Sequence, residues 1–174
     1  MHIKFSLSPI EKLLCQAIAG DIPTNQTAAA KTLRQAVEDT TAFNLAKRNE
    51  VEAMVAHSLD ECKNTESNLY PWQQAHTETH TRISAYLAEL DHIAERLAQA
   101  GILLVALKNG GIARGIYPCP GCCPMGDLDV LVEKRYFRQA HQILLAEGYY
   151  FEFRSLLEEA DLQAAEESGG AEYW

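Results

Sequence analysis

The positions of hydrophobic and polar residues divide the chain into a first part with helical spacing and a second part with short apolar runs. Over residues 10–18, apolar side chains recur at steps of three and four, which is the spacing of one face of an α-helix. Ser8, Pro9 and Glu11 stand in the order typical of a helix start, since the serine caps the helix and the glutamate completes a capping box. We therefore predict a helix that begins at Pro9 and ends before Gly20.

Three further helices are expected before residue 101. Two of them cover residues 28–38 and 42–61, each with apolar side chains on one face. The longest runs from near residue 71 to residue 100, and its apolar positions repeat at steps of four and three, as in a single buried stripe. These positions are Ile83, Leu87, Leu90, Ala94 and Leu97. Nothing in these helices indicates a particular chemistry, so we interpret residues 1–100 as a surface for packing or for a protein partner.

After Gly101 the pattern changes to an alternation of strands and helices. The run at residues 102–107 is wholly apolar and short, which is typical of a strand buried on both faces. The three expected strands cover residues 102–107, 127–132 and 149–153. Of the ten glycines, nine follow residue 100, where turns must separate these elements. We therefore predict an α+β protein in which a helical region, residues 1–100, precedes a small mixed-sheet core, residues 101–174.

The C-terminal residues predict one more helix and then an unfinished element. Ser155 and Glu158 are spaced as another capping box, and they open an acidic helix that we expect to end at about Ser168. Tyr173 and Trp174 then close the chain, although chain ends are normally polar. We interpret these two aromatic residues as the beginning of a strand, so we expect the core to be partial and the chain to be truncated.

Composition and charge narrow the classes of partner. The 174 residues include 15 Lys and Arg against 24 Asp and Glu, so the net charge is −9 at pH 7. An acidic chain is a poor ligand for nucleic acid, because binding the phosphate backbone requires a basic surface. No apolar run approaches the roughly 20 residues of a membrane helix, and the first residues do not resemble a secretory signal. Five cysteines, an odd number, are a poor disulfide framework, which favours a reducing cytoplasm. From the charge, the apolar runs and the cysteines together, we expect a cytoplasmic protein with no membrane or nucleic-acid partner.

Asp127 and Asp129 are the first candidates for chemistry. In the strand expected over residues 127–132 they project from the same face, about 7 Å apart. Two carboxylates at that distance repel each other unless a cation lies between them, and hard oxygen ligands of this kind suit Mg²⁺ or Mn²⁺. Both ions usually bring substrate phosphates with them. The alternative is a pair of solvated aspartates at the end of a strand, or aspartates that cap a nearby helix.

Gly110 and Gly111 stand where an expected strand passes into an expected helix. Free N–H groups and the helix dipole at such a junction favour a phosphate, and glycine lets the phosphate approach the backbone. The alternative is a tight turn without a ligand. A glycine turn followed on the next strand by Asp-x-Asp is more specific than either motif alone, because it predicts a triphosphate site and a metal site on adjacent strands.

Cys119 and Cys122 have Cys-x-x-Cys spacing, which zinc sites and thiol redox sites share. Zinc needs four ligands, so Cys123, Cys15 or a histidine would have to complete such a site. A redox pair is expected at the start of a helix, whereas these cysteines lie in a loop that leads to a strand. Free thiols, zinc binding and redox chemistry therefore stay open as interpretations.

His76 and His80 lie one turn apart in the longest predicted helix. Two histidines at this spacing can chelate a metal ion, but their order differs from the His-Glu-x-x-His of zinc proteases. The alternative is that both are solvated or hydrogen-bonded side chains.

The residues from Leu107 to Val132 are similar to those of a known family. The segments that carry the similarity are Gly101-Ile102, Leu107-Lys108-Asn109-Gly110-Gly111, Tyr117-Pro118 and Pro124-Met125-Gly126-Asp127-Leu128-Asp129-Val130-Leu131-Val132. They resemble the uncharacterised nucleotidyltransferase family, which belongs to the polymerase-beta-like superfamily of nucleotidyltransferases. The resemblance extends over about residues 71–150. It implies that residues 101–174 form a nucleotidyltransferase-like core.

The resemblance also implies a two-metal transfer of a nucleotidyl group from an NTP to a hydroxyl. Two metals can polarise the α-phosphate, align the attacking hydroxyl and stabilise the leaving pyrophosphate. Asp127 and Asp129 would then be catalytic carboxylates that hold Mg²⁺, or Mn²⁺. The implied nucleotide-binding residues are Lys108, Gly110, Gly111 and Arg114. Since the chain is acidic, we expect the acceptor to be a small molecule or a protein.

Three departures from the family pattern keep a second function open. Asn109 replaces the usual glycine after the lysine, and Cys123 stands where an arginine is common. The superfamily mechanism also uses a third carboxylate on a later strand, for which Glu152 is the strand-borne candidate. The alternative is therefore a catalytically inactive nucleotidyltransferase-like module that binds or regulates a partner through its helical region.

Overall fold

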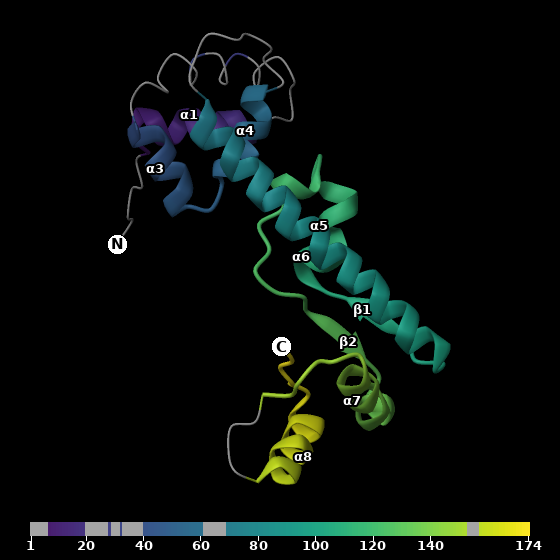
Figure 1. The fold of residues 1–174 in the computed structure, drawn as a ribbon. Helices are drawn as coiled ribbons and strands as arrows, with labels where there is room; N and C mark the ends of the chain where they lie inside the picture. The colour runs from purple at the N-terminus through teal and green to yellow at the C-terminus, as the bar shows by residue number, and fades with distance from the viewer. Residues whose placement is uncertain (1–6, 20–27, 29–31, 33–39, 61–68, 153–156) are drawn as a thin grey trace. The chain divides into compact units, whose positions relative to one another are not determined.

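The computed structural model describes residues 7–19, 28, 32, 40–60, 69–152 and 157–174. In chain order, with the labels of Figure 1, its elements are α1 (Pro9–Ile18), α3 (Thr40–Arg48), α4 (Glu52–Asp60), α5 (Tyr70–Gln99), β1 (Leu104–Ala106), α6 (Lys108–Ile116), η1 (Pro120–Cys122), β2 (Val130–Val132), η2 (Lys134–Tyr136), α7 (Phe137–Ala146) and α8 (Glu158–Ser168). Helices predominate and one small sheet accompanies them, which confirms the α+β class. The helix predicted over residues 28–38 lies, apart from two single positions, outside the described residues.

Two compact units can be distinguished, and each combines two segments of the chain. The first unit consists of Met1–Ala85 and Ile112–Gly126, and the second consists of Tyr86–Gly111 and Asp127–Trp174. Helices α5 and α6 contribute residues to both units. The division of the sequence at residue 100 into a helical region and a core stays a prediction.

Helix α1 begins as its sequence predicts. The backbone N–H of Ser8 donates to Oε2 of Glu11 at 2.6 Å, and the backbone N–H of Glu11 donates to Oγ of Ser8 at 3.3 Å. These two bonds form the expected capping box, which satisfies N–H groups that would otherwise lack a partner at the start of the helix. Leu14 and Ala17 are the buried residues of this helix.

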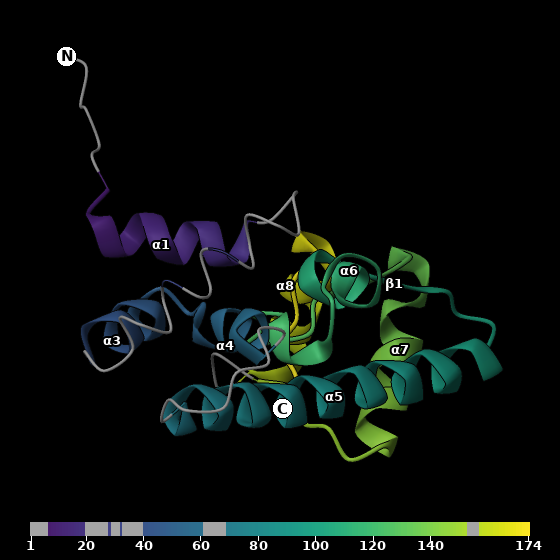
Figure 2. The same cartoon turned by 90° about the horizontal axis from the view of Figure 1, so that it is seen from above.

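Helices α1, α3 and α4 pack with the beginning of α5 to form the core of the first unit (Figures 1 and 2). The ring of Trp72 is buried and meets the ring of Phe43 edge-on, with centroids 5.0 Å apart. The Ser58 hydroxyl donates to the Ala17 carbonyl at 2.7 Å, which joins α4 to α1 inside the core. Helices as short as these three are marginal in isolation, so their stability depends on this packing.

The single helix predicted over residues 42–61 is wrong, because the structure has two helices there, α3 and α4. Helix α3 ends in a Schellman motif, in which the N–H of Val51 donates to the Ala46 carbonyl at 3.1 Å. The N–H of Glu50 donates to the Lys47 carbonyl at 3.2 Å, and Glu50 has the left-handed φ of 56° that this motif requires. Val51 also packs against the core, so the apolar pattern continues across the break and periodicity alone does not reveal it.

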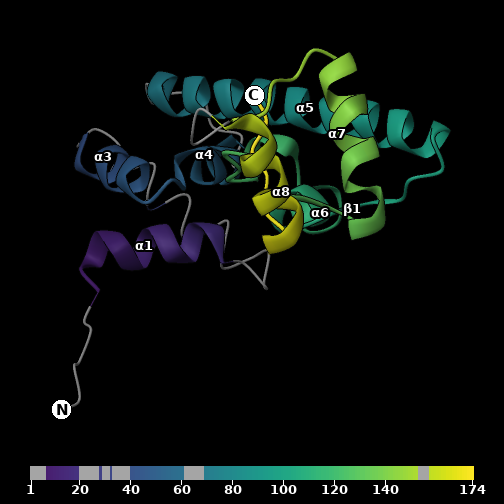
Figure 3. The same cartoon turned by 90° about the horizontal axis from the view of Figure 1, so that it is seen from below.

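Helix α5 is one continuous element, as predicted (Figures 2 and 3). Buried residues of the predicted stripe are Ile83, Leu87, Leu90 and Leu97. A second Schellman motif closes the helix, with Gly101 in the left-handed conformation at a φ of 75°. The N–H of Ile102 donates to the Leu97 carbonyl at 2.9 Å, and the Ile102 side chain is buried. Neither α5 nor any other described helix combines the length and the apolar character that crossing a membrane requires.

Strands β1 and β2 form an antiparallel pair in the second unit. Leu104 pairs with Val132, and both side chains pack on a core formed by the end of α5 and by α7. The neighbouring pair is Val105 with Leu131, and these two residues are 45% and 56% exposed. In the described residues, the expectation of a mixed sheet with a doubly buried first strand is therefore wrong. Successive side chains alternate between the two faces of a sheet, and only one face of this pair is covered.

The third predicted strand, residues 149–153, pairs with the C-terminus, and its last residue lies outside the described part of the chain. Phe151 and Tyr173 form an isolated antiparallel bridge. The backbones of Tyr150 and Trp174 exchange two hydrogen bonds of 3.0 and 3.1 Å. Tyr173 packs on α8, and burial raises the pKa of its hydroxyl to about 12. Tyr173 thus belongs to a small core of the second unit, whereas Trp174 is exposed.

Helix α8 is the predicted acidic helix, and it ends at Ser168 as expected. Gly169 follows in the left-handed conformation, with a φ of 78°, and its N–H donates to the Ala165 carbonyl at 2.8 Å. Acidic side chains in the first turn complement the positive end of the helix dipole. The capping box predicted at Ser155 lies outside the described residues.

We predict that Glu50→Gly stabilises the chain. A non-glycine residue in the left-handed conformation costs about 1–2 kcal/mol, whereas glycine loses about 0.5–1 kcal/mol of additional backbone entropy on folding. The free energy of unfolding, measured by urea denaturation, should therefore rise by about 0.5–1 kcal/mol. Glu50→Ala is the matched control, because it removes the same side chain and keeps the strain. Equal stabilisation by alanine and glycine would show that the backbone conformation is not the cause.

Candidate functional site

Lys108 is the residue at which β1 gives way to α6. The backbone pairing of the two strands continues for one step beyond β1, because the N–H of Leu107 donates to the Asp129 carbonyl at 2.8 Å. The chain then turns at Lys108, whose φ of 47° lies in the left-handed region that side chains rarely adopt. Strained residues of this kind cluster at functional sites, so this turn is a candidate for function.

The ammonium group of Lys108 contacts a carboxylate across this turn. Its Nζ lies 2.7 Å from Oδ2 of Asp129. This hydrogen bond and the charge of Asp129 raise the pKa of Lys108, and the charge of Asp127 adds a smaller increase. The Lys108 side chain is 72% exposed and that of Asp129 is 33% exposed, so the ion pair is open to solvent and contributes little to stability. Its significance is that both aspartates attract one cation.

Both aspartates lie immediately before β2. The strand begins at Val130, so the strand predicted over residues 127–132 is shorter than expected. Asp127 is exposed and Asp129 is half-buried. The same-face arrangement of the two side chains was derived from strand alternation, and it stays a prediction.

Gly110 and Gly111 lie in the first turn of α6, and the structure gives Gly111 a packing role. A Cβ atom at Gly111 would lie 2.6 Å from the backbone oxygen of Ala106, so only glycine lets α6 approach β1 this closely. A Cβ atom at Gly110 would lie 3.6 Å from Leu128, which is an ordinary contact. Asn109 is part of the same helix, and the left-handed position at this junction is Lys108. A role of either glycine in phosphate binding stays a prediction.

Arg114 and Glu152 have separate surroundings. Arg114 is exposed in the last turn of α6 and belongs to the first unit. The Glu152 carboxylate accepts a hydrogen bond from the indole N–H of Trp174 at 3.3 Å. The predicted roles of Arg114 in phosphate binding and of Glu152 as third carboxylate therefore rest on the resemblance alone.

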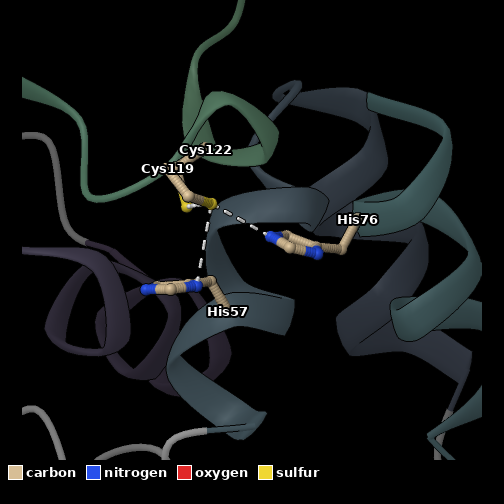
Figure 4. A group of neighbouring side chains, drawn as sticks. All are labelled: His57, His76, Cys119 and Cys122. Carbon is tan, nitrogen blue, oxygen red and sulfur yellow. Dashed lines mark hydrogen bonds between the residues drawn. The ribbon is translucent and has the colours of Figure 1, made fainter. Parts of the chain in front are cut away.

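Four side chains with metal-ligand chemistry meet elsewhere, within the first unit (Figure 4). They are His57 from α4, His76 from α5, and Cys119 and Cys122 from the loop that contains η1. The Sγ atom of Cys119 lies 3.2 Å from Nε2 of His76 and 3.8 Å from Nδ1 of His57. The two sulfur atoms are 3.4 Å apart, and all four ligand atoms lie within 4.8 Å of one another. The arrangement therefore satisfies the proximity that a single metal ion demands.

The Cys-x-x-Cys spacing indicated two members of this cluster, with zinc binding as one of three open interpretations. The histidine pair considered in the sequence was His76 with His80, whereas the structure groups His76 with His57 and the cysteines. His57 gave no signal, because 62 residues separate it from Cys119. Burial lowers the pKa of His76, and the nearby His57 and His80 lower it further. Cys123 is buried outside the cluster, and this burial raises the pKa of its thiol.

Comparison with known proteins identifies the family. A family model described as an uncharacterised nucleotidyltransferase matches residues 35–171, which is most of the chain. The chain belongs to the uncharacterised nucleotidyltransferase family. Searches of the curated proteins and of the solved structures found no significant match. Membership of the uncharacterised nucleotidyltransferase family indicates nucleotidyl transfer as the general class of reaction.

We predict opposite effects for alanine at the two neighbouring glycines. Gly111→Ala places a methyl group against the backbone of β1, and overpacking of this kind costs about 1–3 kcal/mol. At Gly110 the space is open enough for a methyl group, and alanine favours a helix by about 0.5–1 kcal/mol over glycine. Urea denaturation should therefore give a lower free energy of unfolding for Gly111→Ala and an unchanged or higher one for Gly110→Ala. The same loss in both variants would refute the packing role of Gly111.

Proposed function

We propose that this chain transfers a nucleotidyl group from an NTP, in a reaction that depends on Mg²⁺ or Mn²⁺, to a hydroxyl of a small molecule or a protein. The observation that carries the proposal is the turn at Lys108, where one cationic group is attracted by Asp129 and, more weakly, by Asp127. Family membership supports the same class of reaction.

The two carboxylates fit a hard divalent cation. Mg²⁺ is commonly held by one or two carboxylates, with water and substrate phosphates as its other ligands. Asp127 is exposed and Asp129 is half-buried, so both are accessible from solvent. When bound there, Mg²⁺ would act as a Lewis acid on the phosphate of the nucleotide. Asp127 and Asp129 are the residues that would hold it.

Lys108 and a divalent cation would compete for the carboxylate oxygens of Asp129, and this competition suggests a role for Lys108 in binding phosphate. Its ammonium neutralises Asp129 in the structure, at a distance of 2.7 Å. With Asp129 engaged as a metal ligand, the Lys108 ammonium would be available to a phosphate oxygen of the nucleotide. The Lys108 side chain is 72% exposed, so this change of partner requires no repacking. Gly110 lies in the first turn of α6, where backbone N–H groups favour a phosphate, and a role of Arg114 in nucleotide binding rests on the resemblance to the family.

Nucleotidyl transfer also needs a hydroxyl acceptor and a carboxylate base that activates it. With a net charge of −9, the chain favours a small-molecule or protein hydroxyl over nucleic acid. Glu152 is our candidate for the base that activates this hydroxyl. Its Oε2 atom accepts a hydrogen bond from the indole N–H of Trp174, and the carboxylate keeps further acceptor sites for a proton. The second candidate function is a catalytically inactive nucleotidyltransferase-like module that binds or regulates a partner through its helical region, and the departures from the family pattern at Asn109 and Cys123 favour it.

We predict Mg²⁺-dependent binding of at least one of the four NTPs, with a Kd in the micromolar to millimolar range, by isothermal titration calorimetry. Asp127→Asn combined with Asp129→Asn should weaken that binding by at least tenfold, because the hard anionic ligands are lost. Glu133→Gln is the matched control, since Glu133 is an exposed carboxylate just after β2 that pairs with Arg135 at 2.8 Å. Failure of all four NTPs to bind in the presence of Mg²⁺ would overturn the proposal.

Release of pyrophosphate separates the two candidate functions. A nucleotidyltransferase should release pyrophosphate when an NTP and a hydroxyl acceptor are supplied, and Glu152→Gln should reduce kcat with little change in NTP affinity. The inactive module should release no pyrophosphate, either as the wild-type chain or as Glu152→Gln.

A further inference from the structure

We propose that His57, His76, Cys119 and Cys122 bind one Zn²⁺ ion in a tetrahedral Cys₂His₂ site that stabilises the first unit. This inference is independent of the proposed nucleotidyl transfer. It arises from the convergence of four ligand types on one point (Figure 4).

The distances fit zinc. A tetrahedral ion with Zn–S bonds of about 2.3 Å and Zn–N bonds of about 2.0 Å holds its ligand atoms about 3.3–3.8 Å apart. The three separations from Cys119 Sγ are 3.2, 3.4 and 3.8 Å. All four ligand atoms lie within 4.8 Å of one another, so small side-chain rotations complete the tetrahedron.

The chemistry of the donors selects zinc. Thiolate and imidazole are the ligands of structural zinc sites, and Cys-x-x-Cys is the spacing at which such sites take two ligands from one tight turn. Here the turn is η1, in which the N–H of Cys122 donates to the Cys119 carbonyl at 3.0 Å. Two thiolates and two neutral imidazoles balance the charge of Zn²⁺, so the loaded site carries no net charge. This matters because Cys122 is only 2% exposed and an uncompensated charge is costly to bury.

The absence of a side chain at Gly121 leaves room for one of the ligands, the His76 ring. A Cβ atom at this position would lie 2.6 Å from Nε2 of His76, the same nitrogen that contacts Cys119. Glycine between the two cysteines therefore allows the His76 ring to reach the sulfur atoms. Gly121→Ala would displace the ring while leaving all four ligands in the sequence.

The ligand set indicates a structural role. All four positions of the tetrahedron are filled by protein, which leaves no open position for water or substrate. The ligands come from α4, α5 and the η1 loop, which are far apart in the sequence. One ion thus cross-links three segments of the first unit and adds its binding free energy to the stability of the fold.

The first test measures zinc in the full-length chain, purified under reducing conditions without chelator, by elemental analysis and by X-ray absorption at the zinc edge. We expect about one zinc per chain, with a coordination shell of two sulfur and two nitrogen atoms. Substitution with Co²⁺ should give the intense visible absorption of a tetrahedral ion together with thiolate-to-cobalt charge transfer.

Single variants assign the ligands. His57→Gln, His76→Gln and Cys119→Ser should each lower zinc affinity at least tenfold, measured by competition with a chromogenic chelator. The matched controls are His80→Gln, one turn from His76, and Cys15→Ser, an exposed cysteine outside the cluster; both should retain full zinc. Gly121→Ala should weaken zinc binding with every ligand present. Where a ligand variant does not fold, the cobalt spectrum of the wild-type chain still decides whether two thiolates bind.

Two results would overturn the inference. One is a wild-type chain without stoichiometric zinc that also takes up no Zn²⁺ or Co²⁺ after reduction. The other is a Cys119–Cys122 disulfide as the stable form, seen as the loss of two thiols and a metal-free chain, which would indicate redox chemistry. Because zinc content does not depend on NTP binding, either result leaves the proposed nucleotidyl transfer to its own test.

Discussion

The turn at Lys108 is the constraint on which the candidate nucleotide site depends. Strand β1 ends at Ala106 and helix α6 begins at Lys108, so one residue separates the two elements. A left-handed φ at Lys108 makes so short a connection possible, and Gly111 lets the helix pass close to the strand it has just left. As a consequence, the Lys108 ammonium meets Asp129 while the backbone of Leu107 stays paired to the same residue. A looser connection would relieve the strain and would separate the cation from the carboxylates.

Two donor sets of different chemistry follow from the fold, and each lies within one unit. The oxygen donors of Asp127 and Asp129 are hard ligands that suit Mg²⁺ or Mn²⁺. The sulfur and nitrogen donors of the four-residue cluster suit zinc. Because the ligand classes differ, each site should prefer its own metal when both kinds are present: the carboxylates Mg²⁺ or Mn²⁺, and the thiolates and imidazoles zinc. In this interpretation zinc stabilises the first unit, and the second unit carries the chemistry of nucleotidyl transfer.

The sequence predicted features that depend on neighbouring residues. The capping box at Ser8 and the continuous helix α5 each depend on residues within one or two turns, and both are present. The break at Glu50 was missed because a glutamate takes a conformation that usually marks glycine or asparagine. The exposure of Leu103 and Val105 was missed because an apolar run does not reveal how many faces of a sheet are covered.

In the candidate sites, too, features that depend on neighbouring residues were predicted and features that depend on tertiary packing were not. Lys108, the glycines and the Asp-x-Asp motif lie close together in sequence, so their spacing could be read directly. The packing role of Gly111 could not, since it depends on a backbone oxygen of β1. His57 was missed for the same reason, as only tertiary folding brings it to Cys119.

The most direct test of the nucleotide site is the uptake of Mn²⁺ by the full-length chain, followed by electron paramagnetic resonance as the loss of the sharp signal of the free ion. We expect the wild-type chain to take up Mn²⁺, with more uptake when an NTP is present. The variant with asparagine at Asp127 and Asp129 should lose this uptake, whereas Glu133→Gln should retain it. Equal uptake by the wild-type chain and the double variant would contradict the assignment of these two carboxylates as the metal ligands.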